Sequence, residues 1–139
     1  MAGIVRLSIS LEKGLFEKLE RLVEDSRYTN RSEYLRDLIR QRLVEQEWAD
    51  QRQEVIGTIT MVYDHHSRLL SDKLVEIQHE HHEQVLAATH VHLSRHLCAE
   101  MIMVRGSSAR LRALVDRLRQ QRGVLHAELG MSTTGHRLR

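Results

Sequence analysis

The chain has 139 residues, of which 41% are hydrophobic, and its formal net charge is only +2 with the histidines neutral. This length suits one ordinary domain or two very small ones, and the near neutrality excludes nucleic-acid binding through an overall excess of positive charge. A single cysteine excludes an intramolecular disulfide and favours a reduced, cytoplasmic protein, and the apolar stretch IVRLSISL near the amino end is far too short for a signal or membrane segment.

Apolar and polar side chains alternate over residues 4–11, which predicts a short strand with one apolar face. The apolar face carries Val5, Leu7, Ile9 and Leu11, and the polar face carries Arg6, Ser8 and Ser10. A lone strand leaves its backbone groups without partners, so we expect two chains to pair their strands into a ribbon. Such a ribbon fits the major groove of B-DNA, where Arg can read guanine and Ser can bond either base type. The alternative is an ordinary exposed strand face.

Two helices are expected after this strand. Ser10 is placed to cap the first helix, whose leucines recur at helical spacing over residues 11–26. Asn30 together with Glu33 resembles a capping box and begins the second helix, which reaches about Glu47. One strand and two helices lack the bulk for a core of their own, so this segment is expected to dimerise.

The amino end of the second helix is a candidate phosphate contact. Its free N–H groups near Asn30, Arg31 and Ser32 could hold a DNA phosphate, or they could simply be capped, and both can hold at once.

The polar stretch QEWADQRQE has no clear period and predicts a boundary, which gives domains of residues 1–48 and 49–139. Because residues 45–54 have few apolar side chains to pack, we expect the DNA-binding part to swing there. The second domain is predicted to contain a strand, a helix, two strands, a helix and a strand, at about 54–63, 65–82, 84–94, 97–105, 108–122 and 124–131. This order is the ferredoxin-like βαββαβ unit, and the fold class is α+β.

The ten histidines are the unusual feature of the composition, and several of them surround the only cysteine. His90 and His92 are two apart on one strand and so share a face, and a tight turn places His92 opposite Cys98 and His90 opposite Glu100. Two imidazoles and a thiol there could share one metal ion, with Glu100 orienting a ligand imidazole. The alternative is a hairpin with two solvated histidines and a partly buried cysteine. His96 falls in the turn and is expected to point away.

A fourth ligand is available at the end of the preceding helix. The stretch QHEHHE offers His79, His81 and His82, but its spacing does not say which histidine is used, or whether it comes from the same chain. Three nitrogens and one thiolate suit tetrahedral Zn(II) or square-planar Ni(II) and Cu(II), and zinc is the first expectation from the donors alone.

Over nearly its whole length the chain resembles a nickel-responsive transcriptional repressor of the ribbon-helix-helix class. RLSISLEKGLFEKLERLVEDSRYTNRSEYLRDLIRQ resembles the family's DNA-binding segment. The spacing His, ten residues, His, one residue, His, five residues, Cys resembles its metal motif and falls on His79, His90, His92 and Cys98. The resemblance implies a square-planar Ni(II) site in which His79 comes from a neighbouring chain.

The resemblance also implies an ACT-type second domain and a homotetramer, built as a dimer of dimers, that binds operator DNA at two half-sites. By the same likeness, Glu33 and Asp37 hold a secondary cation near the DNA-binding surface.

The predicted function is a non-enzymatic, nickel-dependent repressor that controls genes for nickel uptake or nickel enzymes. One alternative is a ribbon-helix-helix regulator that senses an amino acid or another metal through its ACT-type domain. A metal carrier would not need residues 4–47. A hydrolytic metalloenzyme would need an open coordination position, which four protein ligands would close.

Overall fold

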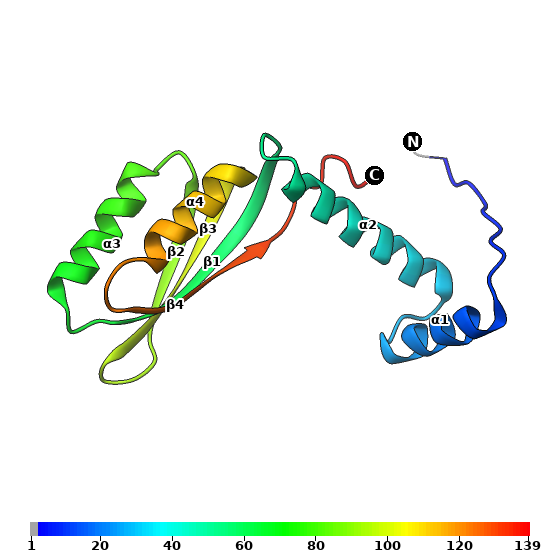
Figure 1. Ribbon diagram of the computed structural model, residues 1–139, viewed down its shortest axis with the longest axis horizontal. Helices are drawn as coiled ribbons and strands as arrows, with labels where there is room; N and C mark the ends of the chain where they lie inside the picture. Colours follow the sequence, from blue (N-terminus) through cyan, green and yellow to red (C-terminus); the bar gives the residue numbers. More distant parts are fainter. Residues whose placement is uncertain (1–2) are drawn as a thin grey trace. The chain divides into compact units, whose positions relative to one another are not determined.

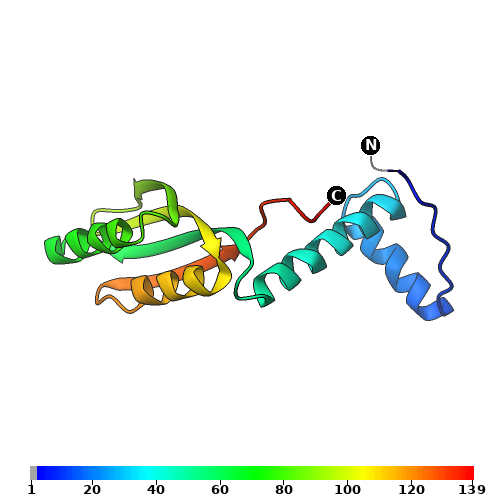
Figure 2. The same ribbon diagram turned by 90° about the horizontal axis from the view of Figure 1, so that it is seen from above.

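The computed structural model describes residues 3–139, which form two compact units (Figures 1 and 2). One unit contains the residues up to Leu43 together with Gly135–Arg139, and the other is Val44–Thr134. The division falls within helix α2 (Arg31–Ala49), several residues before the boundary expected from the polar stretch.

Trp48 is the reason for this difference. Although it lies in a polar stretch, Trp48 is 2% exposed, and its indole N–H donates a hydrogen bond to the Ser132 carbonyl over 2.7 Å. Glu47 beside it is also buried. The expectation that residues 45–54 have little to pack was therefore wrong for the last turn of α2, and only Asp50–Gln53 lie outside helix and strand.

In the first unit, helix α1 (Lys13–Asp25) begins after Glu12, which provides no side-chain cap, so the expected cap at Ser10 was wrong. The start of α2 is confirmed, because the Asn30 side-chain oxygen accepts a hydrogen bond from the Glu33 N–H over 2.9 Å. The strand expected at residues 4–11 is not formed in the single chain. A strand is defined by backbone pairing, and this segment has no partner strand among the described residues.

The second unit contains β1 (Glu54–Asp64), α3 (Arg68–Glu80), β2 (Val85–His92), β3 (Leu97–Ser107), α4 (Ser108–Arg119) and β4 (Val124–Met131). The strands form one sheet in the order β2-β3-β1-β4, and every neighbouring pair is antiparallel. Order and topology confirm the predicted α+β class and the ferredoxin-like, ACT-type βαββαβ fold.

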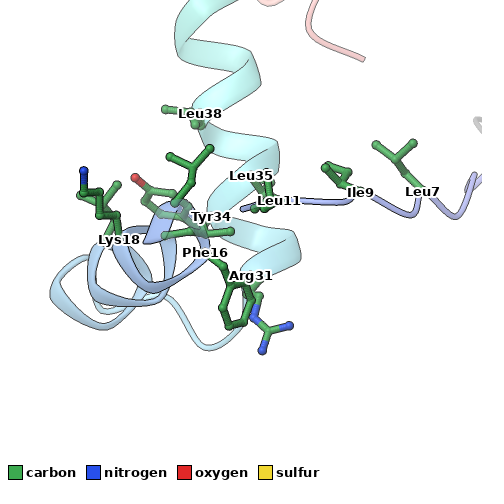
Figure 3. Close-up of a pocket in the computed structure, with 12 residues that line it drawn as sticks. Leu7, Ile9, Leu11, Phe16, Lys18, Arg31, Tyr34, Leu35 and Leu38 are labelled. Atoms are coloured by element: carbon green, nitrogen blue, oxygen red, sulfur yellow. The ribbon is translucent and has the colours of Figure 1, made fainter. Parts of the chain in front are cut away.

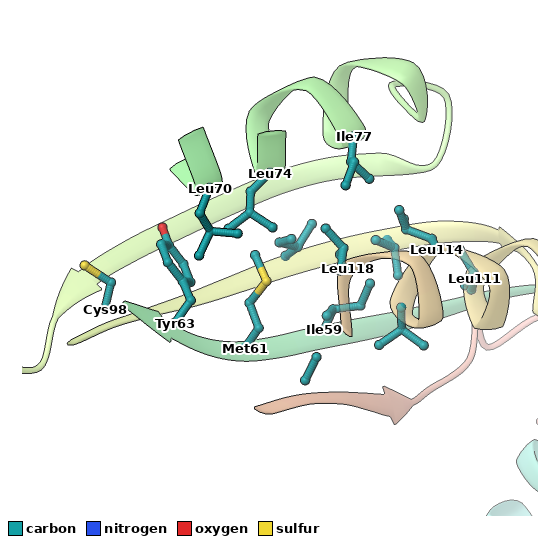
Figure 4. Packing of buried hydrophobic residues seen from close by; sticks show 14 of the residues in the cluster. Ile59, Met61, Tyr63, Leu70, Leu74, Ile77, Cys98, Leu111, Leu114 and Leu118 are labelled. Carbon is teal, nitrogen blue, oxygen red and sulfur yellow. The ribbon is translucent and has the colours of Figure 1, made fainter. Parts of the chain in front are cut away.

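The core lies between one face of this sheet and the helices α3 and α4 (Figure 4). It is built from alternate strand residues and from the apolar stripes of both helices: Val55, Ile59, Met61, Tyr63, Ile102, Val104, Leu70, Leu74, Ile77, Leu111, Leu114, Val115 and Leu118. Trp48 packs at its edge, and Gly57 leaves room for it, since a Cβ at Gly57 would lie 3.2 Å from the indole. The opposite face of the sheet exposes Met101 and Met103.

Serine caps fix where the two covering helices begin. The Ser67 hydroxyl accepts from the Leu70 N–H over 3.3 Å, and the Ser107 hydroxyl accepts from the Arg110 N–H over 3.4 Å. Gly123, with φ at 99°, lies in the left-handed region between α4 and β4. The Ser67 cap fixes the start of α3 after β1, and the pairing of Asp64 with Leu97 places the β1–α3 connection near the hairpin of β2 and β3.

Candidate functional site

The hairpin of β2 and β3 has the predicted register. His92 pairs with Cys98 and His90 pairs with Glu100. All four residues therefore lie on the face of the sheet that the helices cover. Cys98 is fully buried, whereas both histidines are exposed on β2, which is an edge strand.

Three possible metal ligands meet at the turn end of this hairpin. Ligand atoms of His65, His92 and Cys98 all lie within 4.8 Å of one another. The Cys98 sulfur is 3.4 Å from Nδ1 of His92. Two imidazoles and one thiol are donors that suit borderline metals such as Ni(II), Cu(II) and Zn(II), so the residues present fit a metal ion.

His65 is the member of this group that the sequence did not identify. It follows β1 directly, and its backbone N–H donates to the His96 carbonyl over 3.0 Å, which ties the end of β1 to the hairpin turn. Its Nδ1 is buried and has no hydrogen-bond partner among residues 3–139. The sequence does show two adjacent histidines, His65 and His66, just after a predicted strand. They indicate a metal ligand only if β1 is known to pair with β3.

The structure does not bring the other predicted ligands into the group. The His90 ring stacks on Tyr63 at a centroid distance of 6.2 Å and lies 5.0 Å from the His92 ring. His79 is exposed in the last turn of α3. Glu100, which pairs with His90, accepts a hydrogen bond from the Gln78 side chain over 3.3 Å at one carboxylate oxygen, and its role in orienting an imidazole stays a prediction.

The surroundings of Cys98 disfavour a free thiolate. Burial raises the pKa of the Cys98 thiol, and the carboxylates of Asp64 and Glu100 raise it further. Burial likewise raises the pKa of Tyr63 to about 12, with smaller effects from Glu100 and Cys98. Because metals bind the thiolate, a cation here displaces the thiol proton, and metal affinity is expected to rise with pH.

The candidate DNA contacts lie in the first unit. Arg6, Ser8 and Ser10 are exposed, as are the apolar residues of the same segment in the single chain, so their place on a ribbon stays a prediction. Arg31 pairs with Glu20, and its guanidinium lies over the Phe16 ring at 5.2 Å.

The remaining residues at this end of α2 include the predicted cation pair. Ser32 is exposed, close to the capped start of the helix. Glu33 pairs with Arg36 over 2.9 Å, and Asp37 accepts from the Gln41 side chain over 3.0 Å. A hydrogen bond to Asp37 also raises the pKa of Tyr28. Glu33 and Asp37 are thus each engaged by a neighbouring side chain.

An apolar groove runs through the first unit (Figure 3). Its volume is about 590 Å³, and it is lined by Leu7, Ile9 and Leu11 of the amino-terminal segment together with mostly apolar residues of α1 and α2. No residue of α1 is buried. This unit therefore leaves exposed the apolar surface that would normally form a core.

Within the part of the chain that the structure describes, no helix combines the length and the apolar character needed to cross a membrane.

Comparison with known proteins covers both units. Residues 56–132 match the family model for the NikR C terminal nickel binding domain, and residues 5–46 match that for ribbon-helix-helix proteins of the copG family. The chain is 48% identical over 138 residues to a protein of Geobacter sp. (strain M21), and 46% identical over 138 residues to one of Geotalea uraniireducens (strain Rf4). Each match covers 99% of both chains, and each relative is named as a nickel-responsive regulator.

A solved structure of an uncharacterized protein from Thermotoga maritima has the same fold as the second unit. The TM-score is 0.52 at 15% sequence identity, over 56% of this chain and 96% of that one. The family matches do not favour the alternative of an amino-acid sensor. The chain belongs to the family of nickel-responsive, DNA-binding transcription regulators, in which a ribbon-helix-helix segment precedes a nickel-binding domain, and this family consists of regulators rather than enzymes.

Proposed function

We propose that this regulator is a cytoplasmic repressor of genes for nickel uptake or nickel enzymes. It acts as a homotetramer, a dimer of dimers, on an operator with two half-sites. The observation that carries the proposal is the His92–Cys98 pair, with its 3.4 Å separation, inside a segment that matches a nickel-binding domain.

The proposed Ni(II) ligands are His90, His92 and Cys98 of one chain and His79 of another. His79 is exposed in the last turn of α3, where a second chain can reach it, and its choice as a ligand follows from the resemblance to the family's metal motif. His90 and His92 are exposed on an edge strand, where a neighbouring chain can approach them. When bound, the nickel ion would supply the link between chains. The residues of this chain orient the donors and shield the Cys98 sulfur from water.

The proposed DNA-binding surface is a ribbon formed by two chains. The apolar groove of about 590 Å³ in the first unit supports this arrangement, because a second copy would bury its exposed leucines and isoleucine. Arg6, Ser8 and Ser10 then face the bases, while the α2 start at Asn30–Ser32 lies at the phosphates. A secondary cation held by Glu33 and Asp37 remains part of the proposal.

Nickel titrations with and without operator DNA test the proposed switch. If nickel raises DNA affinity at equilibrium, operator DNA must tighten nickel binding by the same total free energy. A shift from 1:99 to 99:1 takes about 5.5 kcal/mol, or roughly 1.4 kcal/mol for each of four sites. The proposed equilibrium coupling is wrong if the nickel isotherms with and without operator DNA superimpose although nickel still raises DNA affinity.

A mixing experiment tests whether the nickel site is shared between chains. His79→Ala chains mixed with Cys98→Ala chains should recover part of the nickel binding that each variant lacks alone, because each supplies the ligand that the other has lost. Nickel bound per tetramer is measured after the chains exchange, and exchange is verified by mass spectrometry. No recovery in confirmed mixed tetramers means that the site lies within one chain.

Arg6→Ala tests the ribbon as the base-reading element. The loss of one bidentate guanine contact should weaken specific operator binding by about 1–3 kcal/mol. Nickel affinity should not change, because residue 6 lies outside the nickel-binding domain. Operator affinity is measured by fluorescence anisotropy at fixed salt, with Arg122→Ala as a control for the loss of one exposed charge. Equal affinities of Arg6→Ala and the unaltered protein would remove the ribbon from the interface.

A further inference from the structure

The last turn of α3, which carries His79, is attached to the second unit on two sides. Gln78 donates a hydrogen bond to Glu100 of β3 over 3.3 Å. On the other side of His79, Glu80 forms an ion pair with Arg117, which lies in the last turn of α4. The two neighbours of His79 in the sequence are therefore bound to different elements, while His79 itself is exposed.

The helical spacing of these residues sets the direction of His79. Successive side chains of an α-helix are about 100° apart around its axis, so Gln78 and Glu80 project to either side of His79. Ile77 is fully buried and points into the core (Figure 4), about 200° around the axis from His79. With both sides held, the imidazole is directed away from its own sheet, where it can meet a second chain.

The last turn of α3 needs a cation beside Glu80. Glu80 is the last residue of α3, and a carboxylate at that place lies at the negative end of the helix dipole, which disfavours the turn. The last carbonyl groups of a helix also lack donors within the helix, so this turn is the part of α3 that opens most easily. The Arg117 guanidinium supplies the positive charge and ties the turn to α4, which is anchored in the core by Leu114 and Leu118.

We propose that Arg117 is a positioning residue for His79, because through Glu80 it holds the last turn of α3 in the direction that presents the imidazole to a neighbouring chain. The inference rests on the proposed function, in which His79 is donated between chains. Arg117 acts by ordering the turn before nickel binds, which lowers the entropic cost of fixing the ligand when the site is completed.

The nickel affinity of Arg117→Ala is the first test. The side chains of the ion pair are 38% and 43% exposed, so its loss should weaken nickel binding only about three- to fivefold, the upper part of the range for exposed ion pairs. Arg117→Lys keeps the positive charge and should stay within about twofold of the unaltered protein. Arg122→Ala is the control, because it removes an exposed arginine that makes no bond to α3 among the described residues. Affinity is measured by competition with a chelator.

Mixed tetramers locate the effect in one chain. A Cys98→Ala chain can supply only its His79 to a repaired site, whereas a His79→Ala chain supplies only the other ligands. Arg117→Ala added to the Cys98→Ala chain should weaken the recovered nickel binding by the same factor. Added to the His79→Ala chain, it should leave the recovered binding unchanged, because that chain has no His79 to position. A general effect on folding would act in either chain.

The positioning role is overturned if Arg117→Ala binds nickel as tightly as the unaltered protein, if Arg117→Lys is as weak as Arg117→Ala, or if both placements in mixed tetramers give the same affinity. No recovery in the mixture without Arg117→Ala overturns the shared nickel site, and the positioning role with it. Recovery followed by an equal loss in both placements overturns the positioning role alone.

Discussion

Replacing Cys98 with alanine is expected to abolish nickel-dependent DNA binding while leaving the fold intact. The Cys98 sulfur is the only thiol in the chain and lies 3.4 Å from Nδ1 of His92, so no other side chain can supply a soft donor at this place. Loss of groups that merely orient metal ligands typically costs 10–100-fold in affinity, so loss of this ligand should cost more than about 100-fold. Nickel affinity is measured by competition with a chelator, and DNA binding by anisotropy with and without nickel.

His66→Ala is the matched control for this experiment. His66 is exposed, and its ring lies 4.4 Å from that of His96, but it is not a member of the group at Cys98. Its loss should change nickel affinity by less than about threefold, which is below the roughly 10–100-fold cost of losing a group that orients a metal ligand. A Cys98→Ala protein that still responds to nickel like the unaltered chain would exclude Cys98 from the site.

Replacing Trp48 with alanine is expected to lower the free energy of unfolding of the second unit by about 3–5 kcal/mol, the usual cost of removing a large buried aromatic side chain. Trp48 is 2% exposed, and Arg112 lies 5.6 Å from the centre of its ring. The indole also makes the hydrogen bond to Ser132. Urea unfolding followed by far-ultraviolet circular dichroism measures the change without relying on tryptophan fluorescence.

Two further variants bracket this result. Trp48→Phe keeps an aromatic ring but loses the indole N–H, so it should be destabilised less than Trp48→Ala. Leu69→Ala removes a side chain from a residue that is 84% exposed, and it should alter stability by less than about 0.5 kcal/mol. A Trp48→Ala protein as stable as Leu69→Ala would show that the end of α2 is not part of the core.

The features that could be predicted from the sequence are those determined by local patterns. The alternation of His90 and His92 and a short turn before Cys98 were sufficient to give the hairpin register that the structure confirms. Leucines at helical spacing likewise located α3 and α4. In each case the residues that carry the signal are close in sequence to the structure that they form.

The features that were missed depend on pairing between distant segments. His65 joins His92 and Cys98 because Asp64 pairs with Leu97, and nothing near His65 in the sequence specifies that pairing. Trp48 is one apolar residue in a polar stretch, so the composition around it indicates a linker even though tertiary packing buries it. The alternating pattern of residues 4–11 was recognised, but a strand also requires a second strand beside it.

The burial of Trp48 determines at which residue the DNA-binding segment of this regulator can be exchanged for that of another protein. In a chimera whose foreign DNA-binding segment ends at residue 48, the donor supplies the side chain at that position. A donor without a tryptophan there would leave the space beside Gly57 and Arg112 unfilled. A junction between Leu43 and Val44 instead keeps the whole of the second unit with its own tryptophan. A junction for exchanging the DNA-binding segment of this chain is therefore best placed within helix α2, and not in the polar stretch that follows it.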